Sequence, residues 1–175
     1  AINAMVDKTF IPIGLSLKVD ATYNRDSYLV SQSGVMVNNH SHHASGTLTT
    51  SFQKISWLRL SAAFTAKYYW ERSRIMKLDV LSSYTTNVAL YLFPTKKMEL
   101  KMKFYNLTNE IMDGHYHTCG LLDGDFNYKI NNVWELGLSG TNLLNSKSYS
   151  ITQNTGINIL NTSLPLRGRE VILRL

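Results

Sequence analysis

Histidine and cysteine side chains, which bind zinc or copper through imidazole nitrogen and thiolate sulfur, occur in two groups in this sequence. The members of the two groups are His40, His42 and His43, followed by His115, His117 and Cys119. We expect both groups to lie in long loops, over Asn38–Ser45 and Asn106–Gly120, without the partners that orient metal ligands. Ordinary loop histidines are the preferred interpretation and metal binding is the alternative, so no metal or cofactor is predicted.

Nucleophilic catalysis would need a serine held beside a histidine and a carboxylate. Serines are frequent, but none lies in a Gly-x-Ser-x-Gly turn or at a spacing that fixes a histidine and a carboxylate beside it. The single cysteine, Cys119, excludes an internal disulfide framework. The sequence therefore does not predict an enzyme.

The elements that would position these residues are strands, and the clearest strand lies between Trp57 and Trp70. Every second residue is apolar, small or aromatic, and these residues are Leu58, Leu60, Ala62, Phe64, Ala66, Tyr68 and Trp70. The intervening positions, which share the other face of an extended strand, include Arg59, Ser61, Thr65 and Lys67. At roughly 3.3 Å per residue the segment spans about 46 Å, which is enough to cross a bilayer at a tilt.

The same alternation recurs in the ranges 11–24, 98–105 and 126–138 and, less regularly, in 78–92. We expect about nine long strands, of which the first and the last run in the same direction. Antiparallel bacterial barrels close with an even number of strands, so this set cannot close by itself. The predicted fold is an all-β, antiparallel transmembrane β-barrel segment that forms part of a larger barrel.

The connections between strands are expected to alternate in length. The short ones are Arg25–Ser27, Gln53–Ser56, Pro94–Lys97 and Asn131–Asn132, and the long ones are Asn38–Ser45, Glu71–Lys77, Asn106–Gly120 and Asn142–Thr162. In outer-membrane barrels the short turns are periplasmic and the long loops are extracellular. Two aromatic girdles would then flank the membrane, formed by Trp57, Phe93 and Trp134 on the periplasmic side and by Tyr68 and Trp70 on the other. The charged residues expected to face the lumen are Lys18, Asp20, Arg59, Lys67, Asp79, Glu99, Lys101, Lys103, Lys129 and Glu135.

Composition agrees with this interpretation. The chain of 175 residues is 44% hydrophobic and 17% charged, and it has no apolar stretch approaching the roughly 18 residues that a membrane helix needs. Any membrane-crossing segment must therefore be a strand, whose alternation hides its hydrophobicity behind a mean hydropathy of -0.14. The formal net charge is +6, but the basic residues are dispersed, which argues against a nucleic-acid partner.

One part of the chain carries a family resemblance. The run GTNLLNSKSY, from Gly140 to Tyr149, is followed by the run PLRGR, which begins at Pro165 and leads into an alternating strand. This order resembles the end of a TonB-dependent outer-membrane transporter, where an Asn-Leu-Phe/Leu-Asn turn with a nearby tyrosine precedes a Pro/Gly-Arg element and the closing strand. The PTKK turn before Met98 is similar to periplasmic turns of the SusC-like nutrient importers.

The resemblance implies that residues 1–175 are the C-terminal part of a barrel of about 22 strands in the Gram-negative outer membrane, with the plug domain outside this chain. It also implies TonB-coupled import of a nutrient of the glycan or peptide class. The implied partners are the lipid bilayer, the remaining strands and the plug, TonB through the plug region, and a surface lipoprotein lid. Because loops and plug residues select the substrate in this family, Tyr105, Tyr116 and His117 are expected near the ligand.

Two other functions stay open. A passive porin or structural outer-membrane barrel would have similar strands, and a gene that encodes no plug would favour it. A soluble β-rich binding module would use the aromatic residues as a core, and purification without detergent would favour it. The interpretations differ in what covers the apolar side of the strands, which is lipid in the two barrels and protein in the soluble module.

Overall fold

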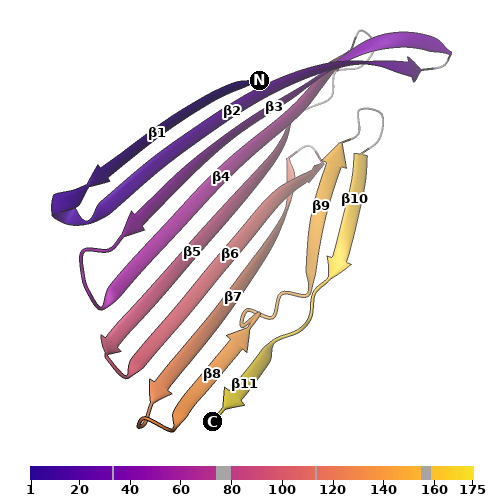
Figure 1. The fold of residues 1–175 in the computed structure, drawn as a ribbon. Coiled ribbons are helices and arrows are strands. Elements are labelled where there is room, and N and C mark those ends of the chain that lie inside the picture. Colours follow the sequence, from indigo (N-terminus) through magenta and orange to yellow (C-terminus); the bar gives the residue numbers. More distant parts are fainter. Residues whose placement is uncertain (33, 74–79, 113, 155–158) are drawn as a thin grey trace.

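A computed structural model describes residues 1–32, 34–73, 80–112, 114–154 and 159–175. Its fold is all-β and antiparallel, as the alternation predicted, with nine strands in one sheet of order β1-β2-β3-β4-β5-β6-β7-β8-β11 (Figure 1). The strands of this sheet are β1 (Ile2–Phe10), β2 (Leu15–Gln32), β3 (Val35–Phe52), β4 (Leu58–Ser73), β5 (Leu81–Thr95), β6 (Met98–Met112), β7 (His115–Lys129), β8 (Glu135–Thr141) and β11 (Glu170–Arg174). A separate hairpin consists of β9 (Ser148–Asn154) and β10 (Ile159–Pro165), and a 3-10 turn, η1, covers Ile11–Ile13.

The pairing register gives the sheet two chemically different faces, because successive side chains of a strand point to opposite sides. The apolar face contains Leu17, Val19 and Ala21 of β2 and Leu48 and Phe52 of β3. On β4 it contains the even-numbered residues from Leu58 to Trp70. It continues with Val88, Leu90 and Leu92 of β5, Leu100, Met102 and Phe104 of β6, and Leu122 and Phe126 of β7. The polar face contains Lys18, Asp20, Ser45, Thr47, Ser61, Thr65, Lys67, Ser83, Asn87, Lys101, Lys103, Asp123 and Asp125. The alternation seen in one segment is therefore continued across the sheet by cross-strand pairing.

No second layer covers the apolar face within the described part of the chain. Val19, Leu48 and Phe64 form one cross-strand row on this face, and they are 46%, 46% and 45% exposed. The hydrophobic residues that are buried in the described ranges are Val37, Leu107 and Cys119, all at register positions on the polar face. An exposed apolar surface of this extent marks contact with a membrane or with a protein partner.

No helix among the described residues is long and apolar enough to cross a bilayer.

Three predicted connections were wrong, because they are parts of strands. Arg25–Ser27 lies inside β2 and Asn38–Ser45 lies inside β3, and these two strands stay paired in register along their whole length. Asn106–Gly120 covers the paired ends of β6 and β7, which turn near Gly114. The ends of these strands carry polar residues on both faces, so their composition resembles that of loops although the backbone hydrogen bonds continue.

The other two long connections differ from the expectation in part. Asn142–Thr162 contains β9 and most of β10, so it forms a hairpin of its own. In Glu71–Lys77, the first three residues belong to β4, and residues 74–77 lie outside the described residues.

The remaining short turns lie at one end of the sheet together with the turn after β1 (Figure 1). Those at Gln53–Ser56 and Asn131–Asn132 lie where the sequence predicted them, whereas only the second half of Pro94–Lys97 is a turn, because Pro94 and Thr95 belong to β5. We refer to this end as the turn end. In the turn after β1, Gly14 adopts a left-handed conformation with φ of 64°, and its carbonyl accepts a 2.9 Å hydrogen bond from the backbone N–H of Gln53. A Cβ atom at Gly14 would lie 2.6 Å from Cβ of Lys54, so both the backbone conformation and the space require glycine.

Asn142 separates β8 from β9. Its backbone is left-handed, with φ of 48°, a conformation that asparagine tolerates better than most residues. Its side-chain NH₂ group donates to the backbone carbonyls of Ser146 and Arg167 at 2.9 and 2.8 Å, and its side-chain oxygen accepts a 2.9 Å hydrogen bond from the backbone N–H of Ser146. One side chain thus joins the link between β8 and β9 to the link between β10 and β11.

The sheet is open within the described residues. β1 and β11 are its two outer strands, and each pairs with one neighbour, β2 and β8 respectively. One edge of each outer strand therefore presents backbone groups that no described strand pairs.

Candidate functional site

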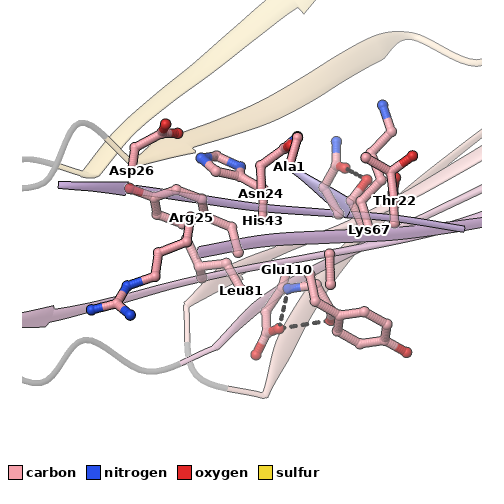
Figure 2. A pocket seen from close by; sticks show the side chains of 16 residues that line it. Ala1, Thr22, Asn24, Arg25, Asp26, His43, Lys67, Leu81 and Glu110 are labelled. Carbon is pink, nitrogen blue, oxygen red and sulfur yellow. Dashed lines mark hydrogen bonds between the residues drawn. The ribbon is translucent and has the colours of Figure 1, made fainter. Parts of the chain in front are cut away.

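The polar face carries a hollow of about 960 Å³ away from the turn end. Polar residues that line it from five adjacent strands are Asn24, His43, Lys67, Ser83 and Asn109. Figure 2 shows the sheet nearly edge-on at this point, with Asn24, His43 and Lys67 on one side and Arg25 and Glu110 on the other. Amide, imidazole, amine and hydroxyl groups thus converge on one space, where they can hydrogen-bond to a polar solute.

A second hollow, of about 330 Å³, follows along the same face toward the turn end. Its polar lining residues are Thr49, Ser61, Asn87, Lys103, Tyr105 and Asp123. We refer to the two hollows together as the polar groove. The smaller hollow lies where side chains on this face are short, as at Ala63 and Ala89.

The charged residues that were expected to face a lumen share the polar face wherever the structure describes them. These residues are Lys18, Asp20, Arg59, Lys67, Glu99, Lys101, Lys103, Lys129 and Glu135. Asp79, the remaining member of the predicted set, lies outside the described residues. Opposite charges lie across neighbouring strands, as at Lys103 and Asp123, and along one strand, where Lys18 and Asp20 form a 3.2 Å ion pair. Positive and negative side chains are therefore interspersed on this face.

The β9–β10 hairpin borders the polar groove. Strand β9 packs against β6 and β7. The Asn109 side-chain amide donates to the carbonyl of Ser150 at 2.9 Å, and the Ser146 hydroxyl donates to the carbonyl of Gly120. Because Asn109 also lines the larger hollow, a shift of the hairpin would change the shape of that hollow.

A buried carboxylate organises the polar face at the end distant from the turns. Glu71 is 2% exposed, and it accepts hydrogen bonds from the Tyr28 hydroxyl at 2.7 Å, from the Asn39 amide at 3.1 Å and from the Tyr69 hydroxyl. Burial and the adjacent carboxylate raise the pKa of Tyr28, which lies near the far end of β2, so its phenol stays protonated as a donor. The sequence analysis missed this network, since its members are far apart in the chain and meet only through the register.

The three residues expected near a ligand do not converge. Tyr105 and His117 have register positions on the polar face, with Tyr105 in the wall of the smaller hollow. Tyr116 follows the opposite alternation and lies on the apolar face, where its hydroxyl is 3.1 Å from the Ser82 hydroxyl. Adjacent residues of a strand cannot share a face, so Tyr116 and His117 cannot contact one solute together.

The first histidine group is divided in the same way. His42 lies on the apolar face, where its ring stacks on Trp70 at 5.1 Å and its Nδ1 is 2.7 Å from the Tyr23 hydroxyl. His43 lies on the polar face, and His40 lies on the apolar face. In the second group, Cys119 is buried and unpaired. Within the described ranges, no three His, Cys, Asp or Glu side chains are grouped so that they could hold a metal ion.

The aromatic residues expected in two girdles lie at the two ends of the strands. Trp57, Phe93 and Trp134 are near the turn end, and Tyr68 and Trp70 are far from it. Phe93 departs from the expectation, because the Arg59 guanidinium carbon lies 5.4 Å from its ring centre and Arg59 belongs to the polar face. Phe93 therefore supports a cation–π contact on the polar face instead of extending the apolar one.

Comparisons of the chain with protein-family models, with curated proteins and with solved structures gave no match. The functional argument therefore depends on three features of the chain itself: the uncovered apolar face, the polar groove on the opposite face, and the order of elements from Gly140 onward.

Proposed function

We propose that this chain forms the C-terminal wall of a TonB-dependent outer-membrane transporter of the SusC-like nutrient importer type. The observation that supports this proposal best is the uncovered apolar face of a sheet whose strands β2 to β7 contain 15 to 18 residues each. A tilted strand needs about 9–11 residues to cross a bilayer, so these strands are long enough with residues to spare. Lipid chains would cover the rows of exposed aliphatic side chains.

The position of the residues along β4 agrees with the dimensions of a membrane. With a tilt of about 40°, each residue rises roughly 2.5 Å along the membrane normal, and about ten residues span the apolar band of about 25 Å. Counted from Leu58, this band ends near Tyr68, where an aromatic girdle is expected. The strand continues to Ser73, so its end would stand outside the membrane on the side distant from the turns.

The polar face would then line the hydrated interior of the barrel, where the polar groove offers hydrogen-bonding groups to a passing solute. Amide and hydroxyl groups suit a glycan or a peptide, which is the nutrient class implied by the SusC-like resemblance. Further strands would pair with β1 and β11, and a plug would occupy the interior and contact TonB. A surface lipoprotein would act as the lid. These partners come from the family resemblance.

Fractionation of cells tests the membrane assignment. The full-length gene product should be recovered with outer membranes, resist extraction by alkaline carbonate and by urea, and require detergent for purification. Recovery of a folded protein from the soluble fraction without detergent would overturn the proposal and favour a soluble β-rich binding module.

Uptake experiments distinguish active import from passive diffusion. Cells with and without the gene would receive fluorescently labelled oligosaccharides and oligopeptides, each with and without an uncoupler of the proton gradient. Active import predicts gene-dependent uptake that the uncoupler abolishes. Gene-dependent uptake that is insensitive to the uncoupler would instead support a passive porin.

A further inference from the structure

Four basic side chains lie together on the apolar face at the far ends of β2, β3 and β4. These residues, which we call the cationic cluster after its two arginines, are Arg25, His40, His42 and Arg72. Arg25 lies opposite His42, and His40 lies opposite Arg72, so the four residues occupy two neighbouring rows of the same face. Neighbouring strands are about 5 Å apart, which places these side chains within reach of a single small anion.

The cationic cluster adjoins an aromatic row. The His42 ring stacks on Trp70 with ring centres 5.1 Å apart and planes inclined by 2°, and its Nδ1 is 2.7 Å from the hydroxyl of Tyr23. Tyr68 lies on the same face next to Trp70, and Phe64 follows farther toward the turn end. Aliphatic, aromatic and cationic side chains thus succeed one another along one face. Acyl chains, the interfacial region and phosphate groups follow in the same order in a lipid leaflet.

The positive charge of the cluster is not neutralised within the described residues. Neither Arg25 nor Arg72 has an ion-pair partner there. The adjacent acidic residues Asp26 and Glu71 lie on the opposite face, and Figure 2 shows Asp26 and Arg25 on different sides of the sheet. Glu110 does share the apolar face, but it is on β6 and already accepts hydrogen bonds from β5 and from the turn after β6. Two guanidinium groups, which bind phosphate through two parallel hydrogen bonds, are therefore available to a ligand.

We propose that the cationic cluster binds the phosphate group of an anionic lipid of the outer leaflet, whose acyl chains lie against the neighbouring part of the apolar face. The inference rests on the proposed membrane function, because a lipid reaches this face only from a bilayer. In a Gram-negative outer leaflet, the lipid with this chemistry is a glycolipid that carries phosphomonoester groups. Arg25 and Arg72 would hold the phosphate, while Tyr23 and Trp70 fix the His42 ring beside it.

The proposal can be tested with the full-length protein in detergent micelles. The probes are diphosphorylated lipid A and the same lipid without its phosphates. For the double variant Arg25→Gln and Arg72→Gln we expect affinity for the phosphorylated lipid to fall about thirty-fold, since each cation near an anionic surface contributes about a factor of five. The double variant Arg25→Lys and Arg72→Lys keeps the charge and should recover most of this affinity.

A matched control removes two charges from the turn end. The variant Lys54→Gln with Lys96→Gln changes the net charge equally, in the turns between β3 and β4 and between β5 and β6, at the opposite ends of the strands from the cationic cluster, and should leave lipid affinity unchanged. Gel mobility before and after heating verifies that each variant is folded. Millimolar inorganic phosphate should compete weakly, because the bound lipid is also held through its acyl chains.

The outcomes separate this inference from the proposed function. Equal binding of phosphorylated and dephosphorylated lipid, unchanged affinity in the Gln variant, or an equal loss in the Lys54 and Lys96 control would each overturn the inference while the protein remains a membrane protein. Failure of the wild-type protein to enter membranes would instead overturn the proposed function.

Discussion

Substitution of Phe64 by arginine tests the central assumption that lipid covers the apolar face. Phe64 is 45% exposed and lies in the middle of β4, six residues from Leu58. At roughly 2.5 Å of rise per residue, the proposed membrane placement would put it about 15 Å from the turn-end boundary, close to the midplane of an apolar band of about 25 Å. Arginine on the lipid side at this depth costs about 2–4 kcal/mol, which lowers the folding equilibrium constant by about 30-fold to 900-fold.

The matched control is Thr65→Arg at the same depth on the opposite face. Thr65 shares the polar face with Lys67, and its hydroxyl lies 3.0 Å from that of Thr47. Losing this hydrogen bond costs about 1 kcal/mol, and the new charge stays in a hydrated space. The control should therefore be clearly more stable than Phe64→Arg.

Urea titration of the full-length protein in phospholipid vesicles provides the measurement, with the folded fraction read from gel mobility without heating. Phe64→Leu serves as a second control, since it keeps an apolar side chain. Equal stability of Phe64→Arg and Thr65→Arg would refute the reasoning, and so would a Phe64→Arg protein as stable as the wild type. If the face were instead exposed to water, the arginine would cost less than about 0.5 kcal/mol.

Three further substitutions probe particular contacts by the same titration. Glu71→Ala should lower the free energy of unfolding by about 1–3 kcal/mol, because it leaves buried donors unpaired, whereas Glu99→Ala on the same face should change it by less than about 1 kcal/mol. If the two losses are equal, the Glu71 network is not stabilising. Asn142→Ala removes three hydrogen bonds and should lower the free energy of unfolding by about 2–3 kcal/mol. Limited proteolysis of this variant should cleave first near residue 142, and a cleavage pattern equal to that of the wild type would contradict the role of Asn142 in joining the two links. Gly14→Ala should cost more than about 1 kcal/mol, since φ is 64° and Lys54 is too close, and a neutral effect would show that the turn can rearrange.

The sequence alone predicted the strand class and the division into two faces, because strict alternation determines which side chains share a side. It predicted the turns at 53–56 and 131–132 for a similar reason, since turn residues interrupt an otherwise regular pattern. It did not predict that Arg25–Ser27 and Asn38–Ser45 are paired strand. Strand pairing satisfies the backbone whatever the side chains are, so a polar composition is weak evidence for a loop.

The candidate site was harder to predict, because it depends on contacts between distant residues. The charged members of the polar face followed directly from alternation. The Glu71 network did not, since Tyr28, Asn39 and Tyr69 reach one carboxylate only after three strands are aligned in register. The cationic cluster is similar: His40 and His42 drew attention as metal ligands, whereas their partners on the same face, Arg25 and Arg72, belong to other strands.

The two outer strands have a consequence for biogenesis. Along the outer edges of β1 and β11 the backbone amides and carbonyls lack partners in the described chain, and in hydrocarbon each such group costs several kcal/mol. If the chain spans a membrane as proposed, it would gain little by entering the bilayer strand by strand. Insertion would become favourable only once the outer edges of β1 and β11 are paired, so the polypeptide would have to be shielded from lipid until late in assembly.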